Sequence, residues 1–202
     1  MEEESGRRCY KKSAVTRQAI FDAAMKLMKE KGYQGTTIRE ICAEAGTAVG
    51  SFYSYYGGKT DILKALYADG EEYFDTVVRA DTGGPDALEN IRIFFRHYAR
   101  LNVRTGVETL RVMFTPDNEW FGRKKMLQQV LEEIICRGQN GGQLRADLEA
   151  LRLVDDLFLY MRGVCYDWCS RGGAYDLEQR MVECLDLVLS GLVPEETTEN
   201  EA

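Results

Sequence analysis

The sequence predicts an all-α protein of about nine helices, because helical apolar spacing persists along the whole chain. Its 202 residues include only three prolines, and apolar residues recur at spacings of three and four. No stretch alternates between apolar and polar residues as a strand does. A chain of this length buries roughly 70% of the surface of its unfolded state, so a hydrophobic core is expected.

The first helices are predicted from apolar spacing and from the residues that begin and end them. A helix is expected over residues 13–31, and Gly32 ends it. The next helix, residues 37–45, begins with a threonine and a glutamate spaced as in a capping box. Gly46 then permits a tight reversal before a second short helix, residues 48–55. Two short helices joined through a glycine are typical of a helix-turn-helix.

Longer helices are expected after this region, each bounded by glycine, proline or polar turn residues. Asp86 and Asp176 are predicted as N-caps. The last residues lack apolar side chains and are expected to be disordered. The predicted ranges are 61–80, 86–104, 107–114, 118–137, 147–171 and 177–192.

Charge is unevenly distributed along the chain. Residues 7–59 contain ten basic and four acidic side chains, although the whole chain carries a net charge of −7. A basic module joined to an acidic body favours a nucleic-acid partner for the module. The single histidine, His97, excludes sites built on paired imidazoles, and no phosphate-binding glycine loop or nucleophile motif is found. A small helical enzyme is therefore not expected, and neither is a cofactor or metal.

The chain is expected to be cytoplasmic, with no membrane partner. No run approaches the roughly 18 to 20 apolar residues that cross a membrane. The acidic start, Met1 to Glu4, leads into no apolar segment, so no signal peptide is expected. The six cysteines are then expected to be reduced thiols.

The first three helices and the start of the fourth resemble the DNA-binding region of the tetracycline-repressor (TetR) family. The matching residues are Arg17, Ile20, Ala23, Ala24, Leu27, Gly32, Thr36, Thr37, Ile38, Ile41, Ala45, Gly46, Gly50, Phe52, Tyr53, Tyr55, Tyr56, Lys59, Ile62 and Leu63. The resemblance implies a homodimeric transcriptional regulator, a repressor, that binds a palindromic double-stranded DNA operator and is released by a small apolar or aromatic effector. It implies a flexible basic arm (1–12), a helix-turn-helix domain (13–60), a ligand-binding and dimerisation domain (61–193) and an acidic tail (194–202).

A helix-turn-helix lays its second helix in the major groove, while nearby amides and hydroxyls hold phosphates. Phe52 and Tyr56 are expected in the core. By resemblance, the DNA contacts are Thr37, Thr47, Ala48, Val49, Gly50, Ser51, Tyr53, Tyr55 and Lys59.

The recognition helix departs from a typical base-reading surface. Residues 47–51 contain no Arg, Asn or Gln, the side chains whose bidentate base contacts are worth about 1–3 kcal/mol. We expect readout to depend on thymine-methyl contacts from Ala48 and Val49, on Tyr53, and on duplex shape. The family commonly carries a basic residue where this chain has Gly57. The basic arm either contacts DNA or is a solvated tail.

An effector is expected to bind among the aromatic and methionine side chains of the middle region, with Arg96, His97, Arg100 or Arg111 to orient it. By resemblance, its binding moves the fourth helix and changes the spacing of paired DNA-binding domains. The predicted pocket residues are Phe74, Phe95, Tyr98, Met113, Phe114, Trp120, Phe121 and Leu127.

The last two long helices are predicted, by resemblance, to form the homodimer interface as a four-helix bundle. Packing within one chain is the alternative reading of the same apolar residues. The predicted interface residues are Leu157, Phe158, Met161, Cys165, Trp168, Met181, Leu185 and Val188.

Two further functions stay open at this point. Cys165 and Cys169 lie four residues apart, which permits a thiol or metal sensor with Cys184 as a third ligand, although buried packing is the favoured role for such cysteines. The apolar recognition helix also leaves room for a protein-interaction module with weak DNA binding.

Overall fold

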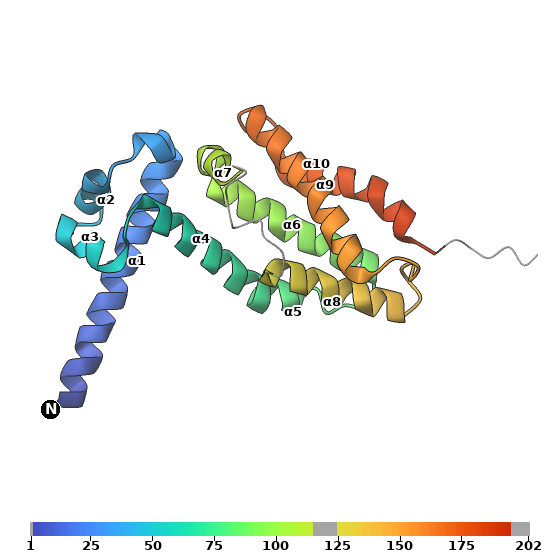
Figure 1. The fold of residues 1–202 in the computed structure, drawn as a ribbon, viewed down its shortest axis with the longest axis horizontal. Coiled ribbons are helices and arrows are strands. Elements are labelled where there is room, and N and C mark those ends of the chain that lie inside the picture. The colour runs from blue at the N-terminus through green and yellow to red at the C-terminus, as the bar shows by residue number, and fades with distance from the viewer. Residues whose placement is uncertain (1, 115–124, 195–202) are drawn as a thin grey trace, which may run out of the picture. The chain divides into compact units, whose positions relative to one another are not determined.

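The computed structural model describes residues 2–114 and 125–194, with side chains from residue 13 onward. These residues form helices and, within the described ranges, no strand, which confirms the all-α fold class. They divide into two compact units (Figure 1). Unit 1 comprises residues 2–68 and 108–114, and unit 2 comprises residues 69–107 and 125–194.

Unit 1 is a small helical bundle in which two short helices, residues 38–44 and 49–55, pack against the long first helix. Its helices are α1 (Glu2–Gly35), α2 (Ile38–Glu44), α3 (Val49–Tyr55), the start of α4 (Lys59–Tyr73), and α7 (Val107–Met113). The helix predicted to begin at Ser13 begins earlier, because the backbone of residues 2–12 is helical and continues into α1. Gly32 breaks α1 with a φ of 76°, a backbone conformation that glycine adopts without steric cost. The interruption predicted at Gly32 is therefore present, although helical structure resumes beyond it as far as Gly35.

The core of unit 1 is formed by one face of each helix. Phe52 is fully buried and its ring lies 5.7 Å from that of Tyr56, which is also buried, so both are core residues as expected. The fully buried partners on the neighbouring helices are Ile20, Ala24, Met28, Ile41 and Ile62. Their burial fixes α2 and α3 against α1.

Unit 2 is built from longer helices. After α4 the chain continues through the π-helix η1 (Phe74–Val78) and α5 (Arg79–Asp81). The remaining elements are α6 (Ala87–Thr105), α8 (Met126–Asn140), α9 (Ala150–Ser170), α10 (Leu177–Leu189) and the 3-10 turn η3 (Ser190–Leu192). Helix α6 packs against α8 and α10, and α9 also packs against these two (Figure 1).

The helix starts in unit 2 follow the predicted capping chemistry. The carboxylate of Asp86 accepts a hydrogen bond from the amide of Glu89, and that of Asp176 accepts one from Gln179, both at 3.0 Å. Both predicted N-caps are confirmed. The helix predicted over 118–137 is described from Met126 onward, and its first residues lie outside the described ranges.

Candidate nucleic-acid interface and effector unit

The N-terminus of α2 is fixed by the predicted capping box. The hydroxyl of Thr37 accepts from the amide of Glu40 at 3.3 Å, and the carboxylate of Glu40 accepts from the amide of Thr37 at 2.9 Å. Lys31 donates to the same carboxylate at 2.8 Å, and these hydrogen bonds, that of Lys31 above all, lower the pKa of Glu40 to about 2. Thr37 itself stays exposed. It is therefore accessible beside the first amides of α2, where a phosphate binds favourably.

The turn between α2 and α3 is short and well defined. Gly46 has a φ of 63°, and the amide of Thr47 donates to the carbonyl of Cys42 at 2.9 Å. Helix α3 then begins at Val49, with Ala48 as an N-cap whose side chain cannot accept a hydrogen bond. The amide of Ser51 donates to the carbonyl of Ala48 at 2.9 Å, so the amides of Val49 and Gly50 are the ones that can serve other acceptors, such as DNA phosphates.

The outer face of α3 carries most of the predicted DNA contacts. Ala48, Val49, Gly50 and Tyr53 are exposed, while the opposite face is held by the buried Phe52. Val49 and Tyr53 are 40% and 57% exposed, so both side chains are accessible to a partner. The other predicted residues of this region, Thr47, Ser51 and Tyr55, are half-buried. The structure therefore gathers these seven residues on and around one exposed helix.

Lys59, predicted as a DNA contact, is engaged inside unit 1. Its ammonium donates to the carbonyls of Tyr33 and Thr36 at 2.6 and 2.7 Å. It also lies 4.5 Å from the centre of the Tyr33 ring. Burial lowers the pKa of this lysine. Its position is thus set by the end of α1.

The positive charge of unit 1 is partly neutralised. Lys26 pairs with Glu44 at 2.6 Å, and Lys31 pairs with Glu40 at 2.8 Å. Arg39, on α2, is exposed and has no ion pair with any residue in the described ranges. Arg39 is not among the contacts predicted from the sequence. Arg39 is the one basic residue between Lys31 and Lys59, and this position within the helix-turn-helix is the sequence feature that could have indicated a DNA contact.

The aromatic residues predicted for an effector pocket pack mainly on one another. In unit 2, the rings of Phe74 and Phe94 are 5.0 Å apart, and Phe95 and Tyr98 both pack edge-on against Phe158. Phe74, Phe95, Tyr98 and Leu127 are buried in unit 2, whereas Met113 and Phe114 belong to unit 1. Trp120 and Phe121 lie outside the described residues. Four of the predicted pocket residues therefore lie in unit 2 and two in unit 1.

The polar groups predicted to orient an effector already have partners. The ring of His97 is bonded at both nitrogens: Nδ1 lies 2.5 Å from the hydroxyl of Tyr73, and Nε2 lies 3.0 Å from the carboxylate of Asp81. Arg96 pairs with Glu89, Arg100 with Glu178 and Arg111 with Glu108. These groups stabilise the units in which they lie, so an effector that used them would have to replace existing ion pairs.

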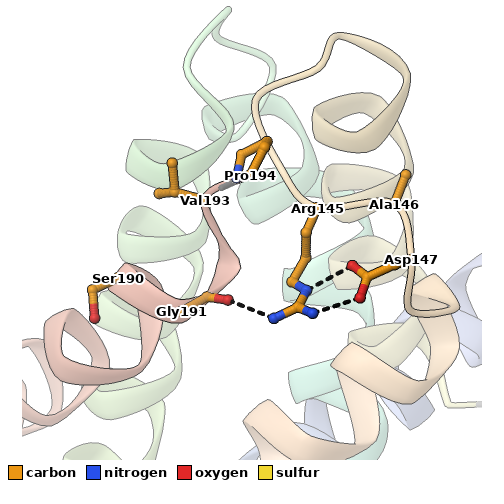
Figure 2. Close-up of a pocket in the computed structure, with 7 residues that line it drawn as sticks. All are labelled: Arg145, Ala146, Asp147, Ser190, Gly191, Val193 and Pro194. Atoms are coloured by element: carbon orange, nitrogen blue, oxygen red, sulfur yellow. Dashed lines mark hydrogen bonds and ion pairs between the residues drawn. The ribbon is translucent and has the colours of Figure 1, made fainter. Parts of the chain in front are cut away.

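A surface hollow of about 420 Å³ lies where the loop before α9 meets the end of η3. Figure 2 shows the guanidinium of Arg145 between Asp147 and Gly191. It donates to both carboxylate oxygens of Asp147, at 2.7 and 2.5 Å, and to the carbonyl of Gly191 at 3.3 Å. The charge of Arg145 is thus compensated within the chain. These contacts tie the loop to the last helical turn and leave no unbalanced charge for a ligand.

The residues predicted for the dimer interface lie mostly in the core of unit 2. Leu157, Phe158, Met161, Cys165, Trp168, Met181 and Leu185 are all buried within the single chain, and Val188 is half-buried. They have almost no surface left to offer a second copy. Between them, Leu159, Tyr160, Tyr166 and Leu187 point outward and are exposed; Leu159 reaches 72% and Leu187 80%. A shallow groove of about 500 Å³ is lined by Leu159 and Tyr160 of α9 together with Arg180 and Cys184 of α10.

The cysteine pair on α9 is part of the same core. Cys165 and Cys169 are buried, and burial raises the pKa of the Cys165 thiol well above its ordinary value. A thiol with a raised pKa is a poor nucleophile and a poor metal ligand. Within the described ranges, no three His, Cys, Asp or Glu side chains are grouped to hold a metal ion. These observations favour the packing role for both cysteines.

The two short helices, the tight turn and the exposed recognition helix define unit 1 as a helix-turn-helix DNA-binding domain. Residues 20–66 match the family described as bacterial regulatory proteins, tetR family. The helix-turn-helix of this chain is thus similar to the DNA-binding domain of this family.

Several named transcriptional regulators are similar to this chain along most of its length. It is 24% identical over 179 residues to the HTH-type transcriptional repressor AcnR of Corynebacterium efficiens, covering 88% of this chain and 92% of the relative. It is 23% identical to the fatty acid metabolism regulator protein of Bacillus subtilis, covering 86% and 93%. A crystal structure of the transcriptional regulator FadR from Bacillus subtilis, in complex with stearoyl-CoA, superposes with a TM-score of 0.74 at 23% identity, covering 87% of this chain and 98% of that one. The shared fold thus extends through both units.

Proposed function

We propose that this chain is a homodimeric transcriptional repressor that binds a palindromic DNA operator and releases it when a small apolar effector binds. The observation that carries the DNA-binding part is the outer face of α3, where Val49 and Tyr53 are exposed while Phe52 on the other side is fully buried. The proposed contacts are Thr37, Arg39, Thr47, Ala48, Val49, Gly50, Ser51, Tyr53 and Tyr55.

The second copy is proposed to bind the outward face of α9 and α10. Leu159, Tyr160, Tyr166 and Leu187 are large apolar side chains that this face leaves exposed in the single chain, and a second copy would bury them. A two-fold axis places the same surface on both partners, as in most homodimers. The residues first predicted for this interface support it from beneath as the core of the helices. A dimer is required because a palindromic operator has two half-sites, about 34 Å apart along the DNA, and each half-site binds one recognition helix.

The effector is proposed to be a molecule with a long apolar part, such as a fatty acyl group. The solved structure of the Bacillus subtilis regulator contains stearoyl-CoA, and the core of unit 2 consists of aromatic and aliphatic side chains. The ion pairs of Arg96 and Arg100 with Glu89 and Glu178 compensate the basic side chains of α6. We therefore expect the apolar part of the effector to supply most of its affinity.

No catalytic step is assigned to the chain, and its proposed location is the cytoplasm, where its DNA partner lies. The named relatives are regulators. None of the helices in the described ranges combines the length and the apolar character that a membrane crossing needs. The thiol-sensing alternative is disfavoured by the burial of Cys165 and Cys169.

The test is selection of bound duplexes from a random DNA pool by the purified protein at two salt concentrations. We expect a palindrome with half-sites about one helical turn apart. Binding without sequence enrichment that disappears as salt rises would contradict the proposal, since phosphate attraction alone behaves in this way. The selected duplex then reports effector action: stearoyl-CoA is expected to release it, while coenzyme A alone at the same concentration is not.

A further inference from the structure

Lys59 lies at the first position of α4, but its ammonium binds the end of α1. The hydrogen bonds to the carbonyls of Tyr33 and Thr36 measure 2.6 and 2.7 Å, shorter than most amide hydrogen bonds. These carbonyls belong to residues past the Gly32 break, and that of Tyr33 also accepts from the amide of Thr36 at 3.4 Å. A cation near carbonyls at the C-terminal end of a helix is favourable because that end carries partial negative charge.

The segment that Lys59 holds is the link between α1 and α2. Thr36 is fully buried, and its hydroxyl donates to the carbonyl of Gly32 at 2.8 Å. The next residue, Thr37, is the N-cap of α2. The carbonyl of Thr36 that Lys59 binds therefore lies directly before the helix that supports α3. Any shift of this carbonyl changes the direction in which α2 begins.

The surroundings of the ammonium differ from those of a phosphate-binding lysine. Two of its three N–H groups donate to carbonyls, and the Tyr33 ring lies 4.5 Å from Nζ. The hydroxyl of Tyr33 lies 3.3 Å from that of Thr60, the next residue of α4. The side chain is half-buried, and burial lowers its pKa, whereas a lysine that waits for a phosphate is normally solvated.

We infer that Lys59 is a positioning residue, which fixes the start of α2 and so the orientation of α3, and that it does not bind a DNA phosphate. Helix α4 leaves unit 1 at Ala68 and continues into unit 2. The ammonium of Lys59 thus joins this connecting helix, through hydrogen bonds, to the link between α1 and α2. The position of that link determines the orientation of the recognition helix α3. The inference rests on the proposed operator binding and replaces the phosphate contact that the sequence predicted for this lysine.

The experiment compares Lys59→Met and Lys59→Arg with the wild type in two measurements. The first is amide hydrogen exchange of α2 and α3 in the full chain without DNA. The second is affinity for the duplex selected by the wild type, between 50 and 200 mM salt, or for a random 30-base-pair duplex if selection fails. Lys64→Met is the matched control, because Lys64 lies on the same helix, is exposed, and forms an ion pair with its neighbour Asp61.

For Lys59→Met we expect amide exchange in α2 and α3 to accelerate about tenfold, and operator affinity to fall by roughly tenfold or more, as for a lost charged hydrogen bond. The salt slope should match that of Lys64→Met. Lys59→Arg should also lose affinity, because a planar guanidinium does not fit the two carbonyls as the compact ammonium does.

The opposite pattern would overturn the inference. If Lys59 bound one phosphate per protomer, Lys59→Met would flatten the salt slope of the dimer by about 1.8 and leave amide exchange unchanged. Lys59→Arg would then keep full affinity, since guanidinium is a strong phosphate ligand. The exchange measurement needs no DNA, so it tests the inference even if the duplex selection contradicts the proposed function. Unchanged exchange in both Lys59 variants would reject the positioning role.

Discussion

The backbone amide of Gly57 donates a 2.7 Å hydrogen bond to Oδ2 of Asp61, in the first turn of α4. This bond, together with Lys64 at 3.2 Å from the other oxygen, lowers the pKa of Asp61. A Cβ at position 57 would lie 2.9 Å from the same Oδ2. That oxygen ends a half-buried side chain that is able to rotate, so the loop before α4 can accept a larger residue.

The first prediction concerns this loop, where the family commonly has a basic residue. Gly57→Lys should increase operator affinity, because Gly57 is exposed and a lysine there adds a phosphate contact. The salt slope should steepen by about 0.9 for each added contact. Gly57→Gln is the control, since it adds a side chain of similar length without charge. An affinity gain that is equal in both variants would show that charge is not the cause.

The second prediction concerns the pH dependence of unit 1. The hydrogen bond from Lys31, followed by those from Thr37, lowers the pKa of Glu40 from an ordinary value of 4.5 to about 2. A carboxylate whose pKa is lower in the folded state stabilises it above pH 4.5, and this contribution is lost as pH falls toward 2. Wild-type unit 1 should therefore lose stability across that window, and Glu40→Gln should lose less.

Denaturant unfolding at pH 6 and pH 3, followed by the fluorescence of a probe attached to unit 1, measures the difference. Glu30→Gln is the control, because Glu30 is an exposed carboxylate on α1. It should show the same pH dependence as the wild type. Equal pH dependence in the Glu40 and Glu30 variants would mean that the capping box does not contribute in this window.

Local chemistry was the part of the structure that the sequence predicted best. The capping box of Thr37 and Glu40 and the helix break at Gly32 depend on residues close together in the chain, so their patterns are readable in one dimension. Lys59 shows the limit. Its partners, Tyr33 and Thr36, lie 26 and 23 residues away, and no local pattern reports that an ammonium will bind carbonyls across that separation.

The faces of α9 show a second limit. Phe158 and Leu159 are adjacent and both apolar, yet Phe158 is buried within the chain and Leu159 is 72% exposed. A helix with apolar residues on two sides can bury one side in its own core and the other against a partner. The sequence alone does not tell which side has which role. The effector pocket was harder still, because buried aromatic residues such as Phe74 and Phe95 pack into a core in the same way as they would line a cavity.

The third prediction concerns the contact between α8 and the start of α6. A Cβ at Gly138 would lie 2.6 Å from Cδ1 of Leu144 and 2.7 Å from Cβ of Ala87. The Ala87 atom is fixed to its backbone and cannot rotate away. Gly138→Ala should therefore lower the free energy of unfolding by about 1–3 kcal/mol through overpacking. Gly191→Ala, where an added Cβ meets nothing within 4 Å, should change it by less than about 0.5 kcal/mol. Urea unfolding of both variants measures the contrast.

The fourth prediction tests the proposed dimer surface. Leu187 is 80% exposed in one chain, so Leu187→Glu should leave the fold of the protomer unchanged. In the dimer the same change buries a charge against apolar side chains and should raise the dimer dissociation constant tenfold or more. Sedimentation equilibrium over a range of concentrations measures this constant. Val103→Glu, which places the same charge at an exposed apolar site on α6, should leave it unaffected. Equal dissociation constants for wild type and Leu187→Glu would place the interface elsewhere.

The fifth prediction tests how α3 reads bases without Arg, Asn or Gln between residues 47 and 51. The 40% exposed side chain of Val49 is free to contact a thymine methyl group in the major groove. Replacing that thymine by uracil removes only the methyl group. The replacement should weaken binding of the wild type several-fold but should have little effect on Val49→Ala, because the variant has already lost the partner. Fluorescence anisotropy with operators carrying one uracil at a time gives the four affinities of each cycle. If uracil weakens both proteins equally at every position, Val49 does not read a methyl group, and sequence preference must come from Tyr53 or from the shape of the duplex.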